Sequence, residues 1–226
     1  MLAWFLAAPH LPGLSLWTDI VLVSFVVMPG TLLLVPLALP LRDYGWKPVT
    51  ILAGVCTLAA LGFAEAGWGL PENFAKLFAA VFAGWAFLFL FEQLSWVVIV
   101  AIVIPFVDSI SVWRGPTHSI TTHHFHVYLD VAIAFLVPGK RAAYLGPPDV
   151  LFYALFLAAA ARWGLRVWWT WIATTLMYGI TIVIANAADV GGLPALPFLS
   201  FGFLLANADL LWTKLRPRAT SSPASS

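Results

Sequence analysis

The sequence predicts an all-α, polytopic membrane bundle of about seven transmembrane helices. Hydrophobic residues make up 62% of its 226 residues and charged residues only 9%, which is outside the range of soluble globular domains. Several apolar stretches approach the roughly 20 residues that a helix needs to cross a bilayer, and polar turns separate them. We therefore expect an integral, multi-pass membrane protein in contact with the lipid bilayer.

The first three predicted spans form an N-terminal helical bundle over residues 1–92. Pro29-Gly30 and Pro36 are expected to bend the first span, and Pro71 favours a turn before the third. The three spans are predicted at residues 17–40, 48–66 and 74–91.

Residues 74–113 are apolar almost throughout. A single helix of that length would rise about 60 Å, twice the ~30 Å hydrocarbon core. Glu92 and Gln93 are the strongly polar residues in its middle, so a tight turn, "FEQLSW", is predicted there before a fourth span at 94–113.

Residues 93–213 are predicted to form a second unit of about four spans, followed by a disordered Pro/Ser-rich tail at 214–226. A mixed segment after Arg114 contains "VAIAFLVPG", which is too short to cross a bilayer. The last three spans are predicted from "GPPD" to about residue 161, at 167–185 and at 194–213.

The basic residues predict an orientation. With seven spans, seven basic residues fall on one side and four on the other, which favours a cytoplasmic C-terminus. The first side carries Arg42, Lys47, Arg162, Arg166, Lys214, Arg216 and Arg218, and the second carries Lys76, Arg114, Lys140 and Arg141.

Asp108 is a carboxylate inside an apolar run, six residues before Arg114. At about 1.5 Å per residue it lies roughly 9 Å inside the end of its span. An ionisable group in a span is by default a hypothesis of a functional site. A structural hydrogen bond to Ser109, Ser111 or a neighbouring helix is the alternative, and the position alone leaves both open.

Other acids have stronger structural interpretations. Asp149, in "GPPDV", follows prolines at a helix start and faces the positive helix end. Asp209, in "LLANADLLW", is expected to pair with Lys214 or to lie at the interface. The acids near turns or span ends are expected to be solvated or interfacial, and they are Asp19, Asp43, Glu65, Glu72, Glu92, Asp130 and Asp189.

Two aspartates can perform chemistry that one cannot. When two carboxyl groups approach, both cannot comfortably ionise, so they share a proton. One then takes a proton from water while the other protonates the carbonyl oxygen of a peptide bond. Asp108 and Asp149 lie near the facing ends of successive long spans, so they can meet at one depth.

Three motifs carry a resemblance to the intramembrane aspartyl proteases of the presenilin and signal peptide peptidase type. In that family one aspartate lies in "YD", a second lies in "GxGD", and "PALP" opens the last helix. The chain reads "FVDSISV" at Asp108, "YLGPPDVLFY" at Asp149 and "GLPALPFLSFG" at residues 192–202, with "PALP" itself at 194–197. The motifs occur in the family's order, within about residues 90–212.

The resemblance implies a presenilin-like C-terminal core and an endopeptidase that cuts transmembrane segments or remnant signal peptides. Asp108 and Asp149 would activate the water, and a transmembrane peptide would be the partner, with neither metal nor organic cofactor. The substrate-binding residues that it implies are Gly146, Pro194, Ala195, Leu196 and Pro197. Pro194 and Pro197 would keep that stretch from being ordinary helix, although they also suit a simple helix start.

The chain departs from the family pattern at three places. Val107 replaces the tyrosine of "YD", Pro148 replaces the second glycine of "GxGD", and three upstream spans are predicted where the family has five. Proline fixes φ and removes an N–H. An inactive relative that binds membrane helices and a transporter whose in-span carboxylates bind protons or cations stay open as alternatives. A prepilin-peptidase-like protease, which also uses membrane aspartates, is a further alternative, and the "LPALP" element argues against it.

Two further classes of function are disfavoured. A net charge of +1 gives no electrostatic basis for nucleic-acid binding. Four histidines cluster in one loop, but no cysteine accompanies them and their spacing matches no zinc pattern, so an interfacial role is preferred. They are His118, His123, His124 and His126.

Overall fold

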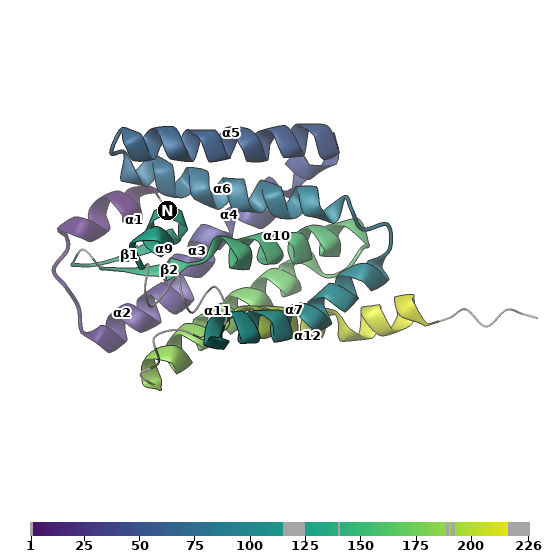
Figure 1. Ribbon diagram of the computed structural model, residues 1–226. Coiled ribbons are helices and arrows are strands. Elements are labelled where there is room, and N and C mark those ends of the chain that lie inside the picture. Colours follow the sequence, from purple (N-terminus) through teal and green to yellow (C-terminus); the bar gives the residue numbers. More distant parts are fainter. Residues whose placement is uncertain (1, 115–124, 140, 189, 191–192, 217–226) are drawn as a thin grey trace, which may run out of the picture.

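The computed structural model describes residues 2–114, 125–139, 141–188, 190 and 193–216. Within these residues the chain is mainly helical, which confirms the all-α class, and one small hairpin is the exception (Figure 1). The long helical segments coincide with the predicted spans. They are Leu16–Tyr44, which is broken into shorter pieces, α5 (Trp46–Glu65), α6 (Gly69–Leu88), α7 (Leu94–Arg114), α10 (Pro147–Arg162), α11 (Val167–Ala187) and α12 (Leu196–Leu215).

Five of these segments are long and apolar enough to cross a membrane, which is compatible with an integral membrane protein. They are Leu16–Tyr44, α5, α7, α11 and α12. The 16 residues of α10 rise only about 24 Å, less than the ~30 Å hydrocarbon core, and α6 carries Glu72 and Lys76 in its first turns. The count of seven spans and the side of the C-terminus stay predictions.

The first long segment is irregular near its prolines, as predicted. A π-helical turn ends at Val27, two residues before Pro29, and the helix is interrupted at Leu33. Pro36 has no N–H, so the Leu32 carbonyl lacks its helical partner and instead accepts a hydrogen bond from the Tyr153 hydroxyl at 3.3 Å. The pieces are α2 (Leu16–Leu22), η2 (Val23–Val27), α3 (Met28–Leu32), α4 (Leu34–Ala38) and η3 (Leu39–Tyr44).

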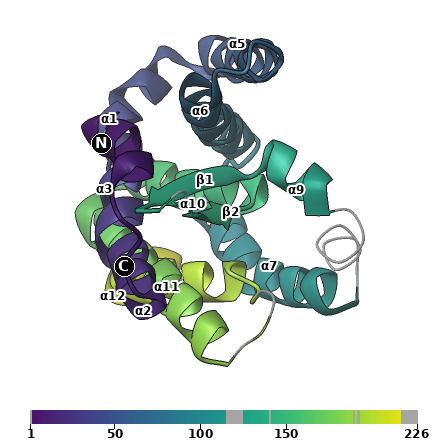
Figure 2. The same ribbon diagram turned by 90° about the vertical axis from the view of Figure 1, so that its left-hand side faces the viewer.

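Helix α10 is the central element of the bundle. Its sequence "VLFYALFLAAAA" is apolar on every side, which is the pattern of a helix buried all round, and residues 153–160 are all fully buried. Figure 2 shows α10 between the α5–α6 pair and the group formed by α7, α11 and α12. Two arginines fix its C-terminal end: Arg42 donates to the Ala158 carbonyl at 2.6 Å, and Arg162 donates to the Leu88 carbonyl at 3.1 Å.

The remaining contacts bring three helix ends together. Helix α12 packs along α7 and α11, while α7 also touches α10. The C-terminal half of α7 and the N-terminal ends of α10 and α12 therefore share one end of the bundle.

A hairpin occupies the apolar piece that is too short to span. Strands β1 (Ile133–Val137) and β2 (Arg141–Leu145) pair antiparallel, and Gly139 takes φ +80° in the turn between them. The sequence contained this signal, because the apolar run at 133–137 and the shorter run at 142–145 flank a turn that contains Pro138-Gly139. The short helices beside the hairpin are α1 (Leu2–Ala7), η1 (Ala8–His10) and α9 (Phe125–Val131).

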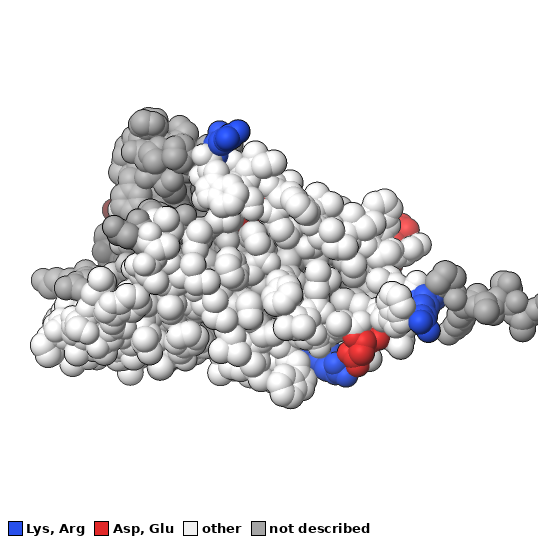
Figure 3. All heavy atoms as spheres, turned by 90° about the horizontal axis from the view of Figure 1, so that it is seen from below, with Lys and Arg blue, Asp and Glu red and all other residues white. Residues whose placement is uncertain are grey.

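The surface of the bundle is apolar over wide areas. Figure 3 shows a face whose centre lacks charged side chains, which lie toward its margins. Large apolar side chains on α7, α11 and α12 are exposed, and such a surface is stable in hydrocarbon rather than in water. They include Ile102, Phe106, Trp168, Trp169, Phe201, Leu205 and Trp212.

Gly84 gives a test of the packing around α10. A Cβ at this position would collide with the Leu151 carbonyl oxygen, so α6 approaches α10 closely only because residue 84 is glycine. We expect Gly84→Ala to destabilise the fold by about 1–3 kcal/mol, measured as thermal unfolding in detergent. Gly54→Ala is the matched control, because its Cβ meets nothing within 4 Å, and it should leave stability unchanged or raise it by up to ~1 kcal/mol. Equal unfolding temperatures for the two variants would contradict this interpretation.

Candidate active site

Asp108 lies on α7 just after a break in the helical hydrogen bonding. Pro105 has no N–H, so the Ala101 carbonyl has no i+4 amide to accept from. The Ser109 hydroxyl donates back to the Pro105 carbonyl at 2.8 Å. The half-buried Asp108 carboxylate therefore sits where α7 is least regular.

The Asp108 carboxylate contacts the "PALP" motif directly. Its Oδ2 accepts a hydrogen bond from the backbone N–H of Leu196 at 3.1 Å. Leu196 is the first residue of α12, and the first amides of a helix have no partner within it, so an acceptor here satisfies one of them. Asp108 therefore makes the hydrogen bond to a neighbouring helix that was the structural alternative to a functional role. The donor, Leu196, belongs to the "PALP" motif that the resemblance assigns to substrate binding.

The residues of the "PALP" motif begin the last helix, as the simpler interpretation held. Pro194 and Leu196 are buried, whereas Ala195 and Pro197 are half-buried. Pro197 occupies the first turn of α12, where a missing N–H costs no helical hydrogen bond.

Asp149 lies in the first turn of α10, directly after Pro147 and Pro148, which confirms the predicted helix start. Its backbone N–H donates to the Gly146 carbonyl at 3.1 Å. A Cβ on Gly146 would lie only 3.2 Å from Asp149 Oδ2, so the glycine leaves room for the carboxylate. Gly146, predicted as a substrate-binding residue, therefore contacts the second aspartate.

The fold brings Asp108 and Asp149 into one region. Their helices contact each other, and Asp149 lies within electrostatic range of Asp108. Asp108 also bonds to the helix that "PALP" begins, so all three sequence motifs meet at one end of the bundle.

Two tyrosines beside Asp149 escaped the sequence analysis. Tyr178 on α11 is 1% exposed, and its hydroxyl donates to the Asp149 carbonyl oxygen at 2.7 Å. Tyr128 on α9 is half-buried. Burial, followed by the charge of Asp149, raises the pKa of the Tyr128 phenol to about 12, so the phenol stays protonated at neutral pH. A lone tyrosine in the otherwise apolar run "LMYGIT" was the available signal for Tyr178.

The outer edge of β1 is covered by side chains. The Asn73 amide on α6 bonds both backbone groups of Ala134, donating to its carbonyl at 2.8 Å and accepting from its N–H at 2.6 Å. The Trp4 indole donates to the Leu136 carbonyl at 3.0 Å. Asn73 and Trp4 thus occupy the place of a further strand along β1.

The outer edge of β2 carries no such cover among the described residues. Ala134 pairs with Tyr144, and Leu136 pairs with Ala142. The N–H and C=O groups of Ala134 and Leu136 point away from β2. In an antiparallel pair the opposite residues then point their groups away as well, so the N–H and C=O groups of Ala142 and Tyr144 face outward from β2. Strand β2 ends at Leu145, and Asp149 follows four residues later in the chain. The open edge therefore leads toward the second aspartate.

A large apolar groove runs beside the site. Its volume is about 1340 Å³, and it lies between α5, α6 and the N-terminal part of α10. Pro147 and Pro148 form part of its wall, so the groove flanks the turn that carries Asp149. Small side chains on the two other helices leave the space open, namely Ala53, Ala60, Ala64, Ala79, Ala80, Ala83 and Ala86.

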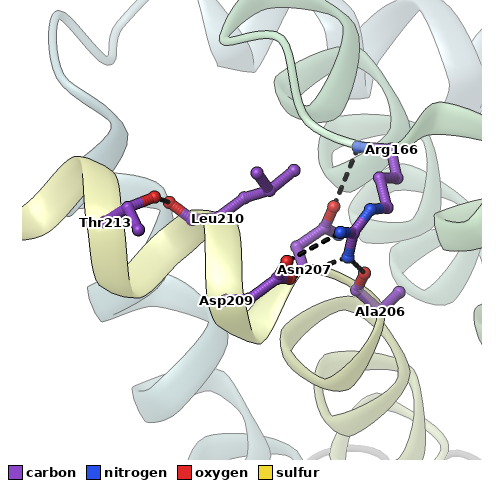
Figure 4. Close-up of polar contacts among 6 residues, drawn as sticks. All are labelled: Arg166, Ala206, Asn207, Asp209, Leu210 and Thr213. Atoms are coloured by element: carbon purple, nitrogen blue, oxygen red, sulfur yellow. Dashed lines mark hydrogen bonds and ion pairs between the residues drawn. The ribbon is translucent and has the colours of Figure 1, made fainter.

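Asp209 is exposed, which is compatible with its predicted interfacial position, but its ion-pair partner differs from the predicted one, and Asp19 differs in its burial. Asp209 does not pair with Lys214; it forms a two-bond ion pair with Arg166, at 2.7 and 2.6 Å (Figure 4). The α10–α11 connection passes beside α12 there, so Arg166 is the nearer cation. Asp19, expected to be solvated or interfacial, is only 4% exposed because α2 packs its first turn against α11.

Several predictions fall partly outside the described residues. His118, His123 and His124 lie there, so the prediction of no metal site stays a prediction. The predicted tail at 214–226 begins inside α12, which continues to Leu215, and residues 217–226 lie outside the described part.

Comparison of the chain with protein-family models, with curated proteins and with solved structures gives no match. The assignment of function therefore depends on the motifs and on the geometry of the site.

Asn207 tests the network that joins α12 to the α10–α11 connection. This fully buried amide accepts from the Arg166 N–H at 2.9 Å and donates to Thr170 Oγ1 at 2.8 Å. Asn207→Ala leaves both groups unsatisfied, so we expect a loss of about 1–3 kcal/mol in detergent unfolding. Asp209→Asn, which breaks an exposed ion pair, should have a clearly smaller effect. A larger effect of Asp209→Asn would show that the ion pair, not the amide, holds the connection.

Proposed function

We propose that the protein is an intramembrane aspartyl endopeptidase of the presenilin type, with seven spans and a four-helix catalytic core. The observation that carries the proposal is the hydrogen bond from Leu196 to Asp108, with Asp149 within electrostatic range. Two motifs that are remote in the sequence are thereby bonded to each other and the third lies near Asp108, which supports a shared catalytic site. The substrate class is a transmembrane segment or a remnant signal peptide.

The proposed reaction is hydrolysis of a peptide bond by a water molecule held between the two carboxyl groups. One carboxylate removes a proton from the water, whose oxygen attacks the carbonyl carbon, while the other carboxyl group protonates the carbonyl oxygen. The resulting tetrahedral diol collapses as the C–N bond breaks and the nitrogen receives a proton. The products are a new carboxyl terminus and a new amino terminus, and the dyad regains its single shared proton.

The open edge of β2 supports a way of presenting the substrate. A helix shields its own peptide bonds, so cleavage requires local unwinding, and the exposed N–H and C=O groups need partners in hydrocarbon. Ala142 and Tyr144 offer outward backbone groups for an added strand. A strand paired there would run past Gly146 toward Asp149.

The prolines of "GPPD" are compatible with this function. Pro147 and Pro148 stand in the first turn of α10, where their missing N–H groups would have had no helical acceptor. Gly146, the glycine that the motif retains, is the one whose Cβ would crowd the Asp149 carboxylate. The replaced glycine is therefore at a position that tolerates proline.

The central test is cleavage of a transmembrane peptide by purified protein in lipid nanodiscs, with products identified by mass spectrometry. Asp108→Asn and Asp149→Asn should each lower the cleavage rate by more than about 100-fold, because neither amide can exchange the catalytic proton. Glu65→Gln, an exposed acid at the end of α5, is the control and should cleave normally.

Equal product from Asp149→Asn and the unsubstituted protein would refute the proposal. Absence of cleavage by the unsubstituted protein, together with ion flux in proteoliposomes that both aspartate variants abolish, would instead establish the transporter alternative.

A substitution on β2 tests strand addition. Ala142→Pro removes an outward N–H without removing a bond of the hairpin, so the fold should persist while cleavage falls at least about tenfold. Ala142→Val keeps the amide and should retain activity. Thermal unfolding of both variants checks the fold, and equal cleavage by the two would argue against pairing at this edge.

A further inference from the structure

The first turn of α10 has few internal restraints although it carries Asp149. Pro147 and Pro148 donate no backbone hydrogen bonds, and no side chain caps the helix at Gly146. The amides of Asp149 and Val150 both donate to the Gly146 carbonyl, at 3.1 and 3.4 Å. A catalytic carboxylate on such a turn needs support from outside its own helix.

The Tyr178 hydroxyl provides a contact of this kind. It reaches from α11 to the Asp149 carbonyl oxygen at 2.7 Å and is buried, so water does not compete for the bond. The contact is made to the backbone of the residue that carries the carboxylate, so it restrains the Cα position and leaves the acid group free to react.

Packing of α11 against the π-helical turn η2 fixes the position of Tyr178 along the α11 axis. A Cβ on the next residue, Gly179, would come within 2.9 Å of the Ser24 carbonyl and 2.8 Å of the Phe25 ring, so α11 lies directly against the π-helical turn η2. The Tyr178 ring packs beside Tyr153, with centroids 6.1 Å apart. The hydroxyl therefore has little freedom to leave the Asp149 carbonyl.

We propose that Tyr178 is a positioning residue for the aspartate dyad, holding the first turn of α10 at the depth where Asp149 meets Asp108. The inference rests on the proposed protease function and adds to it a residue that acts through Asp149. The tyrosine of "YD" is Val107 in this chain, and the tyrosine that bonds the Asp149 peptide comes from α11 instead.

Tyr178→Phe is the informative variant, and Tyr153→Phe is its matched control. Both remove one hydroxyl from a fully buried tyrosine, but the Tyr153 hydroxyl bonds the Leu32 carbonyl, away from the Asp149 peptide. With the transmembrane peptide in nanodiscs, Tyr178→Phe should lower kcat about tenfold with KM unchanged, because displacement of a catalytic group impairs the chemical step rather than binding. Tyr153→Phe should change kcat less than about twofold.

A second measurement keeps the inference separate from the protease proposal. Hydrogen exchange at the amides of residues 150–153 should be several-fold faster in Tyr178→Phe than in Tyr153→Phe, whether or not any peptide is cut. Equal kcat values and equal exchange in the two variants would overturn the positioning role and leave the protease proposal intact. No cleavage by the unsubstituted protein would end the protease proposal, and the exchange data alone would then decide whether Tyr178 holds this turn.

Discussion

The hydrogen bond from the Leu196 N–H to Asp108 is the contact on which the architecture of the site depends. It joins residues 88 positions apart, at the only point where the candidate motifs of α7 and α12 are bonded among the described residues. A carboxylate in apolar surroundings needs a hydrogen-bond donor, and the first amides of a helix need an acceptor. The bond therefore satisfies two polar groups that would each be costly to leave unpaired. The same bond places the "PALP" motif beside Asp108.

Helix α10 adds the second aspartate, Asp149, to this candidate site. Its apolar surface on all sides forces it into the middle of the bundle, and its prolines fix where it starts. Close approach at Gly84 and the two arginine contacts at its far end then set its position along its own axis. Asp149 is consequently held at a defined depth by features that are mostly remote from it.

Most of the helices could be predicted from the sequence, because long apolar runs, polar turns and prolines are local signals. The helix starts at Pro147 and Leu196 and the turn at Glu92-Gln93 follow from such signals. The hairpin was not predicted: the sequence analysis concluded only that the apolar piece at 131–139 is too short to span a bilayer. The partner of Asp209 and the burial of Asp19 depend on which elements become neighbours, and side-chain types alone do not encode that. The same is true of the Tyr178 contact with Asp149.

Under the proposed protease function, the open edge of β2 has a consequence for selectivity. Main-chain groups are the same in every residue except proline, so a site that reads them discriminates poorly between amino-acid sequences. Choice among clients would then follow from how easily each membrane helix melts near its end, with glycine- or serine-rich helices favoured over leucine-rich ones. Such an enzyme would degrade unstable membrane helices in general rather than recognise one cleavage sequence.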